Sequence, residues 1–128
     1  MNIVLWVLQV LLAVAMFLHG YVYVVWPASL VEKVRQRRPD RARPELNPNL
    51  RRFIGLAECA AALGLILPGL TGILPWLTPL AAVGLIVVMG SAIIYHFQTG
   101  DRKGATGPLV MLVVAIVVAY GRLAVARL

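Results

Sequence analysis

The chain alternates four long apolar segments with shorter polar ones. The apolar segments predict membrane-spanning helices at about 3–26, 53–70, 74–98 and 108–126, with a basic loop over 27–52 between the first two. A helix rises about 1.5 Å per residue and the apolar core of a bilayer is about 30 Å thick, so segments of roughly 20 residues can cross it. We therefore predict an all-α membrane protein, in which an antiparallel four-helix transmembrane bundle forms one domain over 1–128.

Two features of the polar pattern refine this picture. Residues 28–38 have the pattern of a short helix on the membrane surface, with apolar positions on one side and basic positions on the other. Pro39, Pro44 and Pro48 predict irregular chain in the rest of the loop. In the second span only about 15 residues precede Pro68, which is about 22 Å of helix. That helix must either continue past Pro68 with a kink or cross a thin region of the membrane.

Composition indicates a membrane protein and argues against a soluble globular domain or a nucleic-acid-binding protein. The chain is 61% hydrophobic and 13% charged, with a mean hydropathy of +0.87, whereas soluble domains are about half apolar and a quarter charged. The net charge is +7, and eight of the twelve Lys and Arg lie in the loop 27–52. Such a loop suits anionic lipid headgroups. Aromatic residues do not alternate with the basic ones as they would on a base-stacking surface, so we predict no nucleic-acid binding.

The positions of the basic residues also predict the orientation of the bundle. The loop 27–52 and the connection after the third span carry ten of the twelve Lys and Arg, so the positive-inside rule places both in the cytoplasm. The first span lacks the basic start and the cleavage site of a signal peptide, and we expect a retained anchor. At the other end, Arg122 lies at the depth of Gln9, and we interpret it as a snorkelling side chain that fixes orientation.

The most informative polar residue is Glu58, the only charge in the apolar run 53–67. A carboxylate inside hydrocarbon costs several kcal/mol unless it is protonated or paired. The two histidines of the chain, His19 and His96, also lie in apolar segments. Counted from the end of each span nearest the basic loop, His19, Glu58 and His96 lie about 10, 9 and 7 Å deep. We therefore predict that the three side chains turn inward in one leaflet and meet as candidate catalytic residues.

Four further residues border this predicted cluster. Tyr23 lies one helical turn after His19 on the same face. Cys59, the only cysteine, follows Glu58 and excludes an intramolecular disulfide. Arg51 and Arg52 stand at the entrance of the second span. We treat these four as candidate ligand-binding residues, although a small packing role also suits Cys59.

The cluster suggests proton chemistry more than metal chemistry. A carboxyl group and a neutral imidazole can share a proton, which suits exchange with a small carbonyl compound or a quinone headgroup. Two histidines and a carboxylate could also bind a metal, but they come from three separate helices and no HxxxH or ExxH pair occurs, so we predict no metal site. Two structural interpretations stay open: Glu58 as a clamp that fixes helix order, and His96 as a solvated interfacial residue.

Three segments carry distinctive motifs: HGY at 19–21, IGLAECAAALGLILPGL at 54–70, and PWLTPLAAVGLIVVM at 75–89 with His96 after it. On these motifs the chain resembles the DoxX-like family of small four-span membrane proteins, over almost its whole length. The resemblance implies a bacterial inner-membrane protein. The family takes its name from a subunit associated with a terminal quinol oxidase, and relatives are connected with thiosulfate:quinone chemistry, which implies a quinone as the ligand or cofactor.

Three functions fit these residues. The leading hypothesis is a protein that binds a small apolar ligand or quinone headgroup in an intramembrane polar cavity, as an accessory to a redox system. The second is a membrane enzyme, an isomerase or oxidoreductase, with Glu58 as general acid or base. The third is a non-catalytic assembly or scaffold subunit that docks through the basic loop. The expected partners are the lipid bilayer, a hydrophobic small molecule, and a second copy of the chain or a redox partner subunit.

Overall fold

The computed structural model describes residues 2–37 and 46–128. Within these ranges the chain forms five α-helices and a terminal π-helical turn: α1 Asn2–Val25, α2 Ala28–Gln36, α3 Pro48–Thr71, α4 Leu77–Gln98, α5 Thr106–Tyr120 and η2 Gly121–Val125. Four segments of the described chain are long and apolar enough to cross a membrane, namely α1, α3, α4 and the continuous stretch Thr106–Val125. The prediction of an all-α membrane bundle is confirmed.

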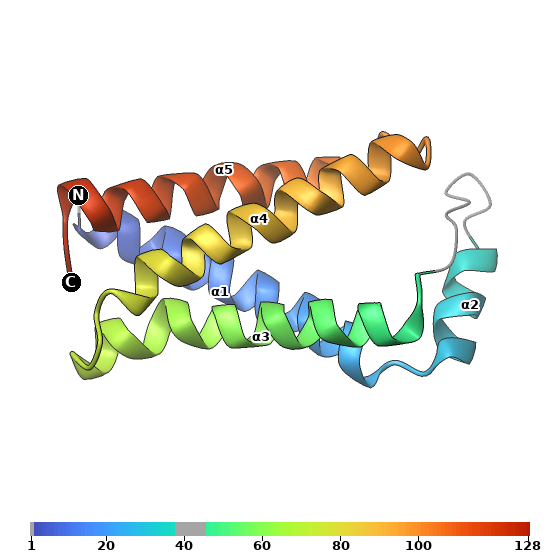
Figure 1. The fold of residues 1–128 in the computed structure, drawn as a ribbon, viewed down its shortest axis with the longest axis horizontal. Helices are drawn as coiled ribbons and strands as arrows, with labels where there is room; N and C mark the ends of the chain where they lie inside the picture. Colours follow the sequence, from blue (N-terminus) through green and yellow to red (C-terminus); the bar gives the residue numbers. More distant parts are fainter. Residues whose placement is uncertain (1, 38–45) are drawn as a thin grey trace.

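The four spans run antiparallel (Figure 1). The start of α1 and the end of η2 lie at one end of the bundle, and α2 lies at the other. α1 packs mainly against α3, and α4 packs against both α3 and α5. In Figure 1, α4 runs diagonally from the end of α3 to the start of α5, so its two ends have different neighbours. This diagonal path decides where the polar residues of α4 lie.

The predicted loop 27–52 is shorter than expected. A short helix is present within the segment 28–38, as α2, Ala28–Gln36. α3 begins at Pro48 rather than at 53, because proline suits the first position of a helix and the Asn47 side chain accepts a hydrogen bond from the N–H of Asn49 at 2.9 Å. Arg51 and Arg52 therefore lie on the first turns of a helix. The irregular chain predicted around Pro39 and Pro44 falls outside the described residues.

Pro68 lies inside α3, and the helix continues through it to Thr71, where Gly72 ends it at φ 70°. Because Pro68 has no N–H, the carbonyl of Gly64 lacks its helical donor. The Thr78 hydroxyl of α4 lies 3.3 Å from that carbonyl oxygen and 3.4 Å from the carbonyl oxygen of Leu65. The Gln9 amide of α1 donates a second bond to Leu65. Side chains of two other helices thus satisfy the backbone that the proline disturbs.

Apolar side chains of all four spans form the core between these helices. The buried set comprises Leu12, Ala13, Met16, Ala62, Leu65, Ala82, Leu85, Met89, Ala115, Val118 and Ala119. The outer surface is also apolar, with large exposed side chains such as Ile3, Phe53 and Leu70. A soluble protein rarely exposes so continuous an apolar surface, whereas lipid tails contact one without cost. The outward side chains therefore face the bilayer.

The backbones of α1 and α3 come into close contact at two glycines, Gly20 and Gly55. A Cβ atom on Gly20 would lie 2.6 Å from the carbonyl oxygen of Gly55, and a Cβ on Gly55 would lie 2.7 Å from that of Gly20. These distances are too short for any side chain, so only hydrogen atoms fit between the two backbones. Small residues at a helix crossing let membrane helices pack by van der Waals contact. The close crossing brings His19 of α1 within hydrogen-bond distance of Glu58 of α3.

We expect Gly20→Ala to lower the free energy of unfolding by about 1–3 kcal/mol, because the added methyl group forces the two helices apart. Gly84→Ala in α4 is the matched control, since nothing lies within 4 Å of a Cβ there. Alanine favours a helix over glycine by up to about 1 kcal/mol, so the control keeps or gains stability. Denaturation of both variants in detergent micelles, followed by circular dichroism, measures the difference. Equal stabilities would contradict the close crossing.

Candidate functional site

The helix crossing at Gly20 and Gly55 brings His19 and Glu58 together. The Nδ1 atom of His19 lies 2.7 Å from Oε2 of Glu58, a hydrogen-bond and ion-pair distance. Glu58 is 1% exposed, whereas the His19 side chain is 48% exposed. The pair therefore has a buried acidic half on α3 and an outward imidazole half on α1. The structure thus gives the lone acid of the second span the partner that its burial requires.

The two carboxylate oxygens of Glu58 differ in their surroundings. Oε2 bonds the imidazole, while Oε1 is buried and has no hydrogen-bond partner among the residues that the structure describes. At this distance the hydrogen bond between Oε2 and Nδ1 can form with either atom as the donor, so Nδ1 stays engaged. The imidazole is then held in one orientation, with its Nε2 atom on the side away from Glu58.

Tyr23 and Cys59 flank this pair. The ring centroids of His19 and Tyr23 lie 4.3 Å apart, with an interplanar angle of 38°. The Cys59 thiol lies 3.8 Å from the carbonyl oxygen of Phe17 and would contact any side chain added at Gly20. Tyr23 therefore adds an aromatic surface to the exposed half of the pair. Cys59 fills space at the helix crossing.

The two arginines expected at the entrance have different positions. Arg51 donates from Nη2 to the carbonyl oxygen of Trp26 at 2.6 Å, so it ties the end of α1 to the start of α3. That carbonyl follows the last turn of α1, where backbone acceptors lack helical donors. Arg52 is exposed on the next position of α3. Arg51 thus holds the two helices in register at the end nearest the His19–Glu58 pair.

The expected third member of the cluster, His96, is not brought to this pair. Its Nδ1 atom lies 3.2 Å from Oδ2 of Asp101, and both residues are 7% exposed. The other carboxylate oxygen of Asp101 accepts a bond from the N–H of Gly104 at 2.9 Å. These contacts fix the connection between α4 and α5. The physical reason is the diagonal path of α4, which carries its C-terminal end away from α3 and toward α5 (Figure 1).

Asp101 was missed as the partner of His96, although the sequence carries a signal for it. Gly100, at φ 76°, turns the chain directly after α4, and the N–H of Asp101 bonds back to the carbonyl oxygen of His96 at 2.9 Å. A histidine in the last turn of a helix, followed by Gly-Asp, is a pattern in which the acid can fold back. The depth of His96 along the helix axis does not by itself predict this contact with Asp101.

Arg122 differs most from its expected role. It is 2% exposed rather than snorkelling to the surface. Its Nε atom donates to Oε1 of Gln9 at 2.8 Å, and Nη1 donates to Oδ1 of Asn2 at 2.6 Å. The matching depths of Gln9 and Arg122 thus reflect a direct contact. This second polar centre lies at the end of the bundle where the chain starts and ends.

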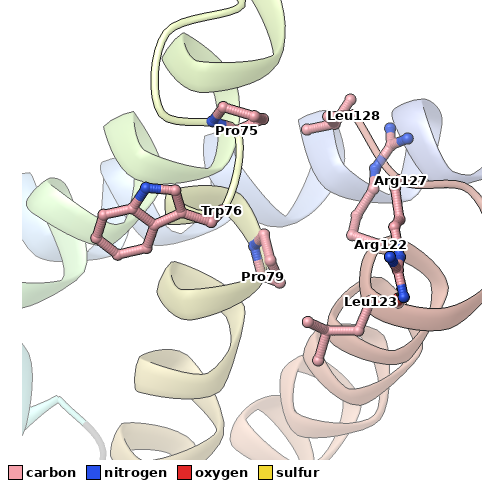
Figure 2. Close-up of a pocket in the computed structure, with 7 residues that line it drawn as sticks. All are labelled: Pro75, Trp76, Pro79, Arg122, Leu123, Arg127 and Leu128. Carbon is pink, nitrogen blue, oxygen red and sulfur yellow. The ribbon is translucent and has the colours of Figure 1, made fainter.

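Two hollows lie away from the His19–Glu58 pair. A cavity of about 260 Å³ lies between the start of α4 and the end of the chain, and Arg122 and Arg127 belong to its lining (Figure 2). An apolar groove of about 360 Å³ runs along the start of α1. His19, Glu58 and His96 line neither of them. In the part of the chain that the structure describes, no group of three His, Cys, Asp or Glu side chains could hold a metal ion.

Comparison with known proteins identifies the family. A model of the DoxX-like family matches residues 7–118, a range that includes the His19–Glu58 pair and His96 and ends before Arg122. No curated protein and no solved structure matches the chain. The match spans most of the four membrane helices that carry the polar pair. The chain therefore belongs to the DoxX-like family.

Proposed function

We propose that this protein binds the carbonyl headgroup of a small molecule dissolved in the membrane, with a quinone as the leading class, and acts as an accessory to a redox system. The observation that carries the proposal is the asymmetry of the His19–Glu58 pair. An imidazole exposed by 48% is held by a carboxyl group exposed by only 1%. The ligand therefore approaches the outward face of α1 and α3, and not an enclosed interior.

The hydrogen-bonding needs of His19 support this proposal. Its Nδ1 atom is engaged by Glu58, which leaves Nε2 as the ring nitrogen that meets the surroundings. Acyl chains offer no hydrogen-bond partner, and an unsatisfied polar group in hydrocarbon is costly. A carbonyl oxygen accepts from a protonated Nε2, and a quinol hydroxyl donates to an unprotonated one. Both forms of a quinone headgroup therefore satisfy this atom.

The surroundings of His19 suit a flat ring. Tyr23 lies beside the imidazole with ring centroids 4.3 Å apart, and apolar side chains such as Leu18 and Phe53 are exposed on the same two helices. An aromatic side chain stacks on a quinone ring, and apolar neighbours accommodate an isoprenoid tail. The site thus combines one polar anchor with apolar contacts.

Glu58 acts in this proposal as a positioning residue. At 1% exposure it does not reach a ligand itself, but its hydrogen bond to Nδ1 fixes the orientation of the imidazole. If the molecule is an enzyme, the same burial makes His19 the group that exchanges a proton with the substrate, with Glu58 behind it. Binding is the function that the geometry supports best, because it requires only the contacts described.

We expect His19→Gln to weaken binding of a short-chain quinone about tenfold. Loss of one hydrogen bond is worth about 0.5–1.5 kcal/mol, and 1.4 kcal/mol corresponds to tenfold in Kd. Glu58→Gln weakens binding less, because the imidazole is retained but less firmly oriented. Titration of the purified protein in detergent, followed by tryptophan fluorescence or calorimetry, measures Kd for each variant. Thermal unfolding of the same samples confirms that each variant is folded.

His96→Gln is the matched control for this experiment. It removes the same kind of side chain from the α4–α5 connection, where His96 contacts Asp101 instead of Glu58, so Kd should stay within about twofold. A wild-type protein that binds no quinone would disprove the proposed ligand class. An equal loss of affinity in the His19 and His96 variants would disprove the assignment of the site to the α1–α3 face.

We also propose that the protein lies in a bacterial inner membrane with α2 and the α4–α5 connection in the cytoplasm. In the sequence, ten of the twelve Lys and Arg belong to residues 27–52 and to the α4–α5 connection, and the positive-inside rule relates such an excess to the cytoplasmic face. The His19–Glu58 pair would then lie in the cytoplasmic leaflet. The Arg122 cavity would lie at the opposite face.

Single cysteines introduced in a Cys59→Ala background should report this orientation. We expect a membrane-impermeant maleimide to label Thr71→Cys in intact cells and to label Lys103→Cys only after the membrane is opened. Both positions are exposed, at opposite ends of the bundle. Labelling in the reverse order would show the opposite orientation.

A further inference from the structure

The cavity at the α3–α4 end of the bundle has two arginines on one wall (Figure 2). Arg122 and Arg127 belong to the C-terminal segment, and Pro75, Trp76 and Pro79 lie on the opposite wall. Leu123 and Leu128 complete the lining. Two cationic side chains therefore face an otherwise apolar space of about 260 Å³. The proposed binding at His19 involves none of these residues.

Arg122 is held by neutral partners only, as far as the described residues go. Its guanidinium bonds Oε1 of Gln9, Oδ1 of Asn2 and the carbonyl oxygen of Ala126, and its Cζ atom lies 5.2 Å from the centre of the Trp6 ring. Its Nη2 atom is buried and has no hydrogen-bond partner in the described chain. A buried cation without a counter-charge is costly, so an anion supplied from outside would stabilise this arrangement.

The local backbone conformation also helps to bury Arg122. The residue lies in the π-helical turn η2, directly after α5. Such turns are rare and frequently occur at functional sites. Gly121 lies against Leu5 of α1 so closely that a side chain there would overlap it. The wide turn and the close contact together bring the guanidinium inside the bundle instead of leaving it at the surface.

The location favours an anion that belongs to the membrane. The cavity lies at the start of α4 and at the end of the last apolar span, Thr106–Val125, and the ends of membrane-spanning helices lie near the lipid headgroups. Trp76, which lines it, is 57% exposed, as is typical of a tryptophan at the membrane interface. Phosphate groups of lipids lie at this depth. Arg127, which is exposed and donates from Nε to the carbonyl oxygen of Leu123 at 2.9 Å, adds a second charge at the mouth of the cavity.

We propose that this cavity binds the phosphate group of one anionic phospholipid, with Arg122 and Arg127 as its ligands. Guanidinium groups recognise phosphate through paired N–H donors. The acyl chains have an apolar path nearby, because Trp6 contacts Arg122 and also lines the groove along α1 formed by Ile3, Val7, Val10 and Leu11. The site thus offers charge for the headgroup and hydrocarbon contact for the tails.

Native mass spectrometry of the purified full chain in detergent tests this proposal. Phosphatidylglycerol, phosphatidylcholine of equal chain length, and inorganic phosphate alone are each added. We expect one phosphatidylglycerol molecule per chain, bound at least fivefold more tightly than phosphatidylcholine. Arg127→Gln should lower that affinity at least fivefold. Because Arg122 supports the fold through Gln9 and Asn2, the exposed Arg127 is the safer variant.

Arg102→Gln is the matched control, since it removes one exposed arginine from the other end of the bundle. We expect it to change the affinity less than twofold. Equal losses in both variants would show that the lipid responds to net charge alone, and would overturn the site. Tight binding of inorganic phosphate without preference for the anionic lipid would overturn the lipid as its source. Equal affinity for the two lipids would exclude a phosphate site that depends on headgroup charge.

Discussion

The structure depends on one constraint: inside hydrocarbon, each polar group needs a partner from another part of the same bundle. Pro68 removes a backbone donor from α3, and Thr78 of α4 supplies a replacement to the freed carbonyl of Gly64. Gln9 of α1 bonds the next carbonyl and also accepts a bond from Arg122. The proline in α3 is thereby connected to side chains of α1, α4 and the C-terminal turn. Hydrogen bonds around Pro68 therefore connect α3, α4, α1 and η2.

The same constraint explains why the two polar centres are so different. At the end near α2, an acid is buried and its basic partner is outward, since Glu58 is 1% exposed and the His19 side chain 48%. At the opposite end, a base is buried and its partners are neutral side chains. The buried acid therefore has a basic partner within the chain, through Oε2 alone, whereas no acidic side chain among the described residues pairs with the buried cation of Arg122. Because Glu58 is paired with His19, the first centre fixes the position of an imidazole. Because Arg122 has only neutral partners among the described residues, the second centre suits the anion that we propose.

The fold was predictable from sequence because hydropathy and helix length determine the number of spans. Depth was predictable too, since 1.5 Å per residue places His19 and Glu58 at the same level, and they do meet. Lateral position was not predictable: His96 has a similar depth, but α4 crosses the bundle diagonally and carries it to Asp101. Arg122 was misjudged for a related reason. Its place near a helix end suggested the surface, but the π-helical turn and the contact of Gly121 with Leu5 bring it inside.

The direction from which a ligand arrives follows from how tightly α1 and α3 approach. With Gly20 and Gly55 in backbone contact, no ligand can pass between the two helices at that level. The buried oxygens of Glu58 are on the inner side of this contact, and the exposed imidazole is on the outer side. Any exchange between the pair and a molecule in the bilayer must therefore pass through the ring of His19. In the proposed function, the acid therefore orients the imidazole without touching the ligand, and the close crossing of the two glycines separates these two roles.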